Sequence, residues 1–183
     1  MSENGGLLLH ICCGPCGGGC VNRPEMISPE RPVTLFYSNS NLDSVEEFER
    51  RLEPVRFLAE FFHLELMVDE YDHEAWKSAV CGLEKEKEGG ARCRKCFEFN
   101  LKRAASAAKK RGLAFATTLT VSPRKSSRVI FEVGAALPGF EAVDFKKKNG
   151  YLTGVNFARE HDFYRQNYCG CEFSRRQENT QNE

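Results

Sequence analysis

The chain has 183 residues, no formal net charge, and a hydrophobic content of 41%. This length suits one domain, which we expect to span 1–183 with disordered tails at 1–6 and 175–183. Zero net charge excludes nucleic-acid binding through the overall field of the protein, so any anionic partner must be held by local basic patches. No stretch approaches the ~20 apolar residues that span a bilayer, and the apolar run after residue 6 is too short for a secretory signal. We therefore expect a cytoplasmic protein with no membrane partner.

The first half of the chain alternates short strands with helices. The continuous apolar run 7–11 predicts a strand buried on both faces of a parallel sheet, followed by a glycine- and cysteine-rich loop at 12–20. A second strand is predicted at 33–37 and a third at 64–68. Between them, a charged helix over 43–61 is predicted to break at Pro54, and after them Asp72 is expected to cap a helix that carries Trp76.

The second half continues the alternation. A charged surface loop is expected at 84–90, and helices at 93–111, 126–137 and 155–161, with strands at 114–121 and 141–145. The pattern predicts an α/β fold of three layers, a parallel sheet with helices on both faces. Ligands of such sheets gather beyond the carboxyl ends of the strands, so the residues that follow the first strand mark the expected active edge.

Nine cysteines is a high count for this length, and seven of them form three tight groups. The groups are Cys12, Cys13 and Cys16; Cys93 and Cys96; and Cys169 and Cys171. Thiols stay reduced in the cytosol, so clustered cysteines favour metal or redox chemistry over structural disulfides. The isolated Cys20 and Cys81 are expected to take no part. Among the histidines, His10 is expected to be a hydrogen-bonded core residue, and His63, His73 and His161 surface or packing residues.

Each group permits a specific chemistry. Adjacent thiolates such as Cys12 and Cys13 repel each other unless a cation or cluster holds them. Cys93 and Cys96 are spaced to face one ion or cluster, and the positive end of their helix, with Arg92 beside them, is expected to lower their pKa values. Spacing alone leaves zinc and iron–sulfur open. The Cys169–Gly–Cys171 pair suits either an easily reduced disulfide or two further ligands.

Polar segments complete the candidate site. Residues 122–128 combine a helix start, small hydroxyls and cations that suit a phosphate, with a solvated loop as the alternative. Residues 164–168 offer rings that can stack on a base and side chains that can read its edge, with a polar surface turn as the alternative. The expected substrate contacts are Tyr37, Asn39, Ser122, Arg124, Lys125, Arg165, Gln166 and Asn167.

Together these motifs resemble the cobalamin-independent epoxyqueuosine reductase family. The segments LLLHICCGPC, FYSNSN, RCRKCF, SPRK and YRQNYCGC occur in that order, and the resemblance covers about 7–174. It implies an α/β fold of the nucleotide-binding (HUP, adenine nucleotide alpha hydrolase-like) type. It also implies reduction of the epoxide of epoxyqueuosine at the wobble position of tRNA, which gives queuosine in the last biosynthetic step. The implied partners are tRNA carrying epoxyqueuosine and an electron donor that the sequence does not identify.

The resemblance also implies roles for the cysteines. Cys12, Cys13, Cys93 and Cys96 match ligands of a [4Fe-4S] cluster, and Cys169 and Cys171 match a catalytic redox-active pair. A second, mononuclear iron is a further expectation, with Cys16 as its candidate ligand. The glycines at 14 and 17–19 depart from the alanine-rich or serine-containing loop expected of the family, which leaves the local loop geometry open.

Three other functions compete with this one. The cysteines could belong to a structural zinc-binding module. An ATP-dependent tRNA-modifying transferase uses the same sheet type, but its phosphate loop ends in serine where this chain has cysteines. A plain thiol–disulfide oxidoreductase that used Cys93 and Cys96 would leave Cys12 and Cys13 unexplained.

Overall fold

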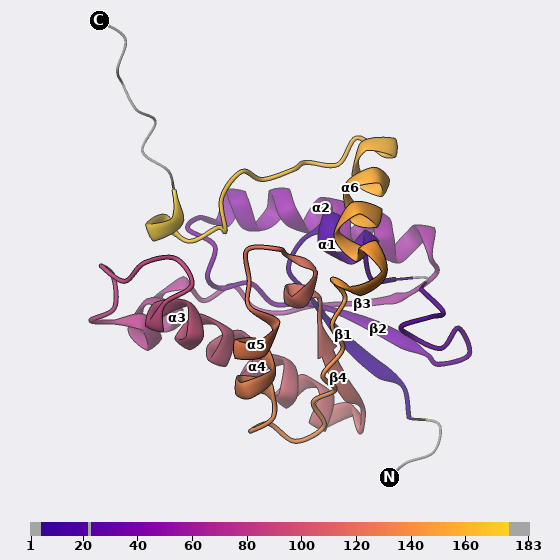
Figure 1. The fold of residues 1–183 in the computed structure, drawn as a ribbon, viewed down its shortest axis with the longest axis horizontal. Coiled ribbons are helices and arrows are strands. Elements are labelled where there is room, and N and C mark those ends of the chain that lie inside the picture. The colour runs from indigo at the N-terminus through magenta and orange to yellow at the C-terminus, as the bar shows by residue number, and fades with distance from the viewer. Residues whose placement is uncertain (1–4, 22, 176–183) are drawn as a thin grey trace, which may run out of the picture.

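The computed structural model describes residues 5–21 and 23–175, and it has three layers built on one parallel sheet (Figure 1). The strand order is β3-β2-β1-β4, so β1 lies between two partners. All five residues of β1 are buried. The predicted three-layer parallel fold is confirmed, as are the first three strands. The strands are β1 (Leu7–Ile11), β2 (Val33–Tyr37), β3 (Glu65–Val68) and β4 (Ala114–Thr117).

Helices cover both faces of the sheet (Figure 1). Leu7, Leu9 and Ile11 pack into one core with α2, and the intervening Leu8 packs into a second core with α4 and α5. Alternate side chains of one strand therefore build both cores, as period-two geometry requires. The helices are α1 (Gly14–Gly18), α2 (Val45–Phe61), α3 (His73–Val80), α4 (Ala91–Arg111), α5 (Ser127–Gly134) and α6 (Gly150–Glu160).

Local signals set several helix ends, and the cap predicted at Asp72 is confirmed. The Asp72 side chain caps α3 by accepting a hydrogen bond from the backbone N–H of Ala75 at 2.9 Å. Ser44 caps α2 in the same way, and Gly112 ends α4 in the left-handed conformation with φ +65°. His10 is a buried core residue as expected, with Nδ1 2.8 Å from the Thr117 hydroxyl.

Two predictions about helices were wrong. The segment after β1 is not simply a loop, because α1 begins at Gly14 and turns the chain immediately beyond the sheet. The helix over 45–61 runs through Pro54 without a break. Pro54 is buried, and its ring lies against Gly14, whose missing side chain leaves room for it. Packing between α1 and α2 therefore offsets the hydrogen bond that proline removes.

The last two strand predictions were also wrong in part. β4 stops at Thr117, whose hydroxyl accepts a hydrogen bond from the Leu119 N–H and starts a 3-10 helix over Thr118–Val121. Residues 141–145 form no strand. Instead the Thr120 hydroxyl donates to the Val143 carbonyl at 2.9 Å and accepts from the Phe145 N–H at 3.2 Å. The Glu141 N–H still donates to the Phe115 carbonyl of β4 at 2.8 Å, but beyond it the side-chain hydrogen bonds of Thr120 take the place of a ladder.

The ends of the described chain are attached to the fold. Arg31 donates to the Gly5 carbonyl at 3.0 Å, and Arg175 pairs with Asp43 at 2.5 Å. The rest of the predicted tails, 1–4 and 176–183, lies outside the described residues. No helix in the described ranges is long and apolar enough to cross a membrane.

Replacement of Gly154 by alanine is expected to lower the free energy of unfolding by about 1–3 kcal/mol, although alanine is the better helix former. The reason is that a Cβ at this position of α6 would clash with the backbone oxygen of Pro15 in α1. Urea denaturation measures the change. Thr153→Ala, at the exposed neighbouring position, is the control and should change stability by less than about 0.5 kcal/mol. A Gly154→Ala protein as stable as the control would contradict the close packing of α1 on α6.

Candidate metal and substrate site

Three thiols converge where β1 ends. Cys12 follows β1 directly, Cys13 is the N-cap of α1, and Cys16 lies one turn later on the same helix. Their sulfur atoms all lie within 4.8 Å of one another, and those of Cys12 and Cys13 are 4.0 Å apart. Within 5–21 and 23–175, no other group of three or more cysteine, histidine or carboxylate side chains brings its ligand atoms this close. We call these residues the thiol triad.

Hydrogen bonds distribute charge unevenly in the thiol triad. The thiols of Cys12 and Cys16 donate toward Cys13 and lower the pKa of Cys13 well below its usual value. Hydrogen bonds of Cys16 with Cys12 and with Cys13, together with burial, raise the pKa of Cys16. The amide nitrogen of Gln166 also donates to the Cys13 sulfur, at 3.1 Å. Cys13 is therefore the member of the thiol triad that most readily carries negative charge.

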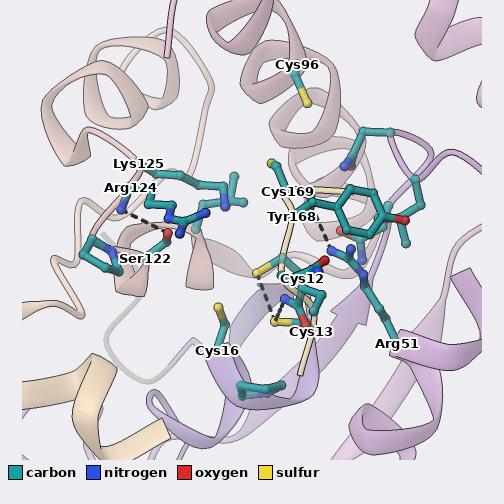
Figure 2. A pocket seen from close by; sticks show the side chains of 18 of the residues that line it. Cys12, Cys13, Cys16, Arg51, Cys96, Ser122, Arg124, Lys125, Tyr168 and Cys169 are labelled. Atoms are coloured by element: carbon teal, nitrogen blue, oxygen red, sulfur yellow. Dashed lines mark hydrogen bonds between the residues drawn. The ribbon is translucent and has the colours of Figure 1, made fainter. Parts of the chain in front are cut away.

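All seven clustered cysteines line two adjoining cavities. The larger, of about 330 Å³, is lined by the thiol triad together with Cys96 and Cys169. The smaller, of about 110 Å³, is lined by Cys93, Cys96, Cys169 and Cys171. Figure 2 shows Cys96 on α4, with its sulfur directed toward Cys169 and the thiol triad. The unpaired Cys20 and Cys81 line neither cavity: one is in the core and the other is exposed.

The structure brings together a different set of thiols from the four expected as cluster ligands. Cys16 joins Cys12 and Cys13, whereas Cys93 and Cys96 approach from the first turns of α4 without entering that tight group. Cys96 shares the larger cavity with the thiol triad, and Cys93 lines only the smaller one. The four-cysteine ligand set therefore stays a prediction.

The expected pKa shifts of Cys93 and Cys96 were wrong in direction. Burial raises the pKa of the Cys93 thiol, and burial together with the negative charge of Cys169 raises the pKa of Cys96. Burial in an apolar environment disfavours the thiolate more than the helix end and nearby cations favour it. Charges adjacent in the sequence indicate the second effect, whereas burial appears only in the fold.

Cys169 and Cys171 occupy different environments. Both are free thiols. Cys171 is buried in a small core with Trp76 and Val80, whereas Cys169 lines both cavities. Cys169 is thus the member of the pair that faces the thiol triad.

The first two turns of α2 hold the segment that carries this pair. Arg51 donates to the Cys169 carbonyl at 2.9 Å and to the Glu47 carboxylate at 2.6 Å. Glu47 in turn accepts a hydrogen bond from the Tyr164 hydroxyl at 3.2 Å. Arg51 is 3% exposed and Glu47 8% exposed, so this is a buried ion pair. We call residues 164–171 the strap, since both of its ends are attached to the Glu47–Arg51 pair.

Glycine is required between the two cysteines of the strap. Gly170 has φ +126°, and its carbonyl accepts a hydrogen bond from the Asp43 N–H at 2.9 Å. A Cβ at this position would lie 3.0 Å from Arg51 Nη1 and would clash with Leu42. The Cys–Gly–Cys spacing therefore reflects how closely the strap lies on α2.

The sequence missed Arg51 and Glu47 as site residues. Their i, i+4 spacing is visible in the sequence, but such pairs usually lie on solvated helix faces. The structure also adds Asn100, which is buried, lines the larger cavity and donates to the Asn41 side chain at 3.0 Å. No local pattern in the sequence indicates it.

Most of the expected substrate contacts line the larger cavity. Asn39 is anchored by donating to the Ile11 carbonyl at 3.0 Å. Tyr37 differs from the expectation: its side chain is in the core and its hydroxyl donates to the Phe48 carbonyl at 2.8 Å. Strand periodicity explains the difference, because Tyr37 shares the α2 face of the sheet with Leu35. The expected residues that line the cavity are Asn39, Ser122, Arg124, Lys125, Arg165, Gln166 and Asn167.

Lys125 supplies positive charge beside the thiols (Figure 2). Burial lowers its pKa, but the negative charges of Cys169 and of the thiol triad outweigh burial, so the pKa of Lys125 is raised. A positive charge on Lys125 and a negative charge on a sulfur of this cavity thus stabilise each other.

Comparison of the sequence with known proteins matches the chain to one family. The family model for "Epoxyqueuosine reductase QueH" matches residues 7–177, which include all seven clustered cysteines. The chain belongs to this family. Proteins named epoxyqueuosine reductase QueH from Streptococcus pyogenes and Thermotoga maritima are 35% and 36% identical to it. These alignments cover 92% of the chain and 69% of the Streptococcus protein, and 93% of the chain and 90% of the Thermotoga protein. A relative of the same name from Acinetobacter baylyi is 33% identical over 94% of the chain and 82% of its own length. Membership confirms the resemblance stated from the motifs.

Replacement of Arg51 by methionine is expected to lower the free energy of unfolding by about 3–5 kcal/mol, because it leaves Glu47 charged, buried and unpaired. Urea denaturation measures the loss. Arg56→Met, at an exposed position of the same helix, is the control and should be nearly neutral.

A double variant separates the ion pair from side-chain volume. Glu47→Leu/Arg51→Met should lose less stability than the sum of the two single changes, because no charge is left unpaired. Additive losses, or an Arg51→Met protein as stable as Arg56→Met, would show that the pair does not stabilise this part of the fold.

Proposed function

We propose that this chain reduces the epoxide of epoxyqueuosine at the wobble position of tRNA and forms queuosine. The observation that carries the proposal is the family match over 7–177, which includes every clustered cysteine. The structure supports it, because thiols from three segments of the chain line two adjoining cavities. We further propose that the chain acts as a single domain in the cytoplasm.

The residues present fit a metal group bound by thiolates. Sulfur ligands select zinc or iron–sulfur clusters, and the thiol triad offers three sulfurs within 4.8 Å. We infer a [4Fe-4S] cluster held by Cys12, Cys13, Cys93 and Cys96, with Cys16 beside it as a ligand for a mononuclear iron. A cluster of this kind supplies single electrons at low potential.

The dithiol of the strap can supply the electrons and protons that the reaction consumes. Conversion of an epoxide to an alkene takes two electrons and two protons, and it releases the oxygen atom as water. Oxidation of the Cys169 and Cys171 thiols to a disulfide yields two electrons and two protons. An external reductant must then return the disulfide to the dithiol. Because Cys169 lines both cavities, it is the thiol of the pair that can pass electrons to a group bound in the larger cavity.

Other side chains of the larger cavity bind and orient the substrate. Asn39 and Asn167 offer hydrogen-bonding groups, and Arg124 and Lys125 offer positive charge. Negative charge develops on the epoxide oxygen as its bond to carbon breaks, and a cation placed in advance stabilises that charge. Lys125 is suited to this role because its pKa is raised in this cavity.

A structural zinc site is the alternative that the same donor set allows. Purification without oxygen, followed by iron and sulfide analysis, decides between the zinc site and the iron–sulfur cluster. We expect a brown protein that absorbs near ~400 nm, the general property of thiolate-bound iron–sulfur clusters, whereas zinc leaves the protein colourless. A colourless, zinc-containing protein that still reduces the substrate would rule out the cluster.

Cysteine variants test the ligand set. Cys93→Ser/Cys96→Ser is expected to lose the ~400 nm absorbance and activity on tRNA carrying epoxyqueuosine. Cys16→Ser should keep the absorbance, and Cys81→Ser, at an exposed thiol outside the cavities, is the control. If Cys16→Ser loses the cluster and Cys93→Ser/Cys96→Ser keeps it, the proposed ligand set is wrong. The cluster is then held by the thiol triad and not by Cys93 and Cys96.

The dithiol has a separate test. Cys169→Ser is expected to retain its bound iron and sulfide but to lose multiple turnover when the reductant is a dithiol. Cys171→Ser should behave in the same way, because either change prevents the disulfide. Wild-type turnover in both variants would remove the dithiol from the reaction while leaving the metal site intact.

A further inference from the structure

The larger cavity has room for one part of an RNA chain. Its volume of about 330 Å³ is at the lower end of small-molecule pockets, which run from ~300 to ~1,000 Å³. If the substrate is a nucleotide within tRNA, as the proposed function states, the nucleotides on either side of it must lie at the cavity mouth. Recognition of single-stranded RNA commonly stacks such bases on aromatic rings. The rim of the cavity is therefore where a stacking residue should be found.

Both tyrosines of the strap are already engaged within the fold. The Arg50 guanidinium lies 3.7 Å from the centre of the Tyr164 ring, and the Tyr164 hydroxyl is bound to Glu47. Tyr168 has the guanidinium groups of Arg51 and Arg175 each 5.2 Å from its ring centre. The strap rings expected from the sequence to stack on a base are thus paired with arginines.

Tyr151 is the remaining aromatic candidate. The aromatic side chains that line the larger cavity are those of Phe97, Tyr151 and Tyr168. Phe97 is 7% exposed and belongs to the α4 core, whereas Tyr151 is 49% exposed. Within 5–21 and 23–175, Tyr151 has no ring or guanidinium partner among the stacking and cation–π contacts. Its ring is therefore available at the rim.

Hydrogen bonds fix the backbone that leads into α6, the helix that carries Tyr151. Arg23, which is buried, donates to the carbonyls of Phe145, Lys147 and Lys148 at 3.1–3.2 Å. It also donates to the Gly19 carbonyl at the end of α1, at 3.0 Å. One guanidinium thus ties the chain before α6 to the helix that carries Cys16. With the backbone fixed, only the side-chain torsions of Tyr151 lose freedom when a base stacks on its ring.

Exposed cations flank this ring. Arg124 and Arg165 are exposed and line the same cavity from different segments of the chain. Lys147 and Lys148 are exposed just before α6. Positive groups around an aromatic ring suit the backbone of a single strand whose bases stack. The chain has no net charge, so an anionic partner must be held by local cations such as these.

We propose that Tyr151 is a stacking platform for a tRNA base adjacent to the nucleotide that enters the larger cavity. Arg124 and Arg165 contact the phosphates on either side of that nucleotide. The inference rests on the proposed function for its ligand, an RNA loop, and adds the residue that recognises the flanking base.

The test is equilibrium binding of a fluorescent anticodon stem-loop RNA without the epoxide, which requires neither turnover nor bound metal. Tyr151→Ala should weaken binding about 5- to 150-fold, the range that corresponds to the loss of one base–aromatic stack. Tyr151→Phe keeps the ring and should bind as wild type does. Leu152→Ala is the matched control, because Leu152 is an exposed neighbour that does not line the cavity.

Two further measurements separate stacking from charge. Tyr151→Ala should leave the slope of log affinity against log salt unchanged, whereas Arg165→Gln should reduce it by about 0.7, the value for one phosphate of a single strand. A stem-loop that lacks the bases flanking the target nucleotide should bind Tyr151→Ala and wild type equally.

The outcomes distinguish the two proposals. If wild type prefers the stem-loop to a duplex of equal length and Tyr151→Ala binds it equally well, the stacking platform is overturned and the proposed function stands. If wild type shows no such preference, the RNA ligand itself fails and both proposals are overturned. Equal losses in Tyr151→Ala and Leu152→Ala would assign the effect to the fold of α6 and overturn the platform.

Discussion

The pairing of β1 on both of its edges is the constraint on which the rest of the structure depends. β1 lies between β2 and β4, and all four strands run in the same direction, so the chain leaves them at one edge of the sheet. Cys12 and Cys13 follow β1 at once, and the 3-10 helix after β4 brings the Thr118 hydroxyl to 3.4 Å from the Cys12 sulfur. Segments far apart in sequence thus meet at a single rim because hydrogen bonds of the sheet set their ends side by side.

Features of the fold that depend on neighbours in sequence were predictable. The apolar run of β1, the capping Asp72 and the terminating Gly112 each act through local geometry or periodicity. Features that depend on distant partners were not. The Thr120 side chain forms hydrogen bonds to the backbone 23 and 25 residues away, where a strand was predicted. The helix continues through Pro54 because Gly14 leaves room for its ring. The same division holds in the site. The grouping of cysteines in the sequence predicted that the site lies at the carboxyl ends of the strands, but burial raises the pKa values of Cys93 and Cys96, which the sequence predicted to be lowered.

The Glu47–Arg51 pair shows how a charged helix contributes to the site by holding the strap in place. The pair is buried beneath the strap, and each partner also binds strap atoms, Tyr164 through Glu47 and Cys169 through Arg51. Taking two charges out of water is unfavourable unless hydrogen bonds satisfy them, and the strap provides one to each partner. The geometry of the Cys169–Cys171 pair is therefore coupled to the integrity of α2, and changes in that helix alter the dithiol indirectly.

Trp76 is the single tryptophan of the chain, is fully buried, and lines the smaller cavity beside Cys96 while packing against Cys171. Indole emission is sensitive to its surroundings, so the single tryptophan is an intrinsic probe that lines the same cavity as Cys93, Cys96, Cys169 and Cys171. Titration with metal, oxidant or reductant can therefore be followed by emission alone, with no label attached to any of the cysteines that the experiment must leave intact.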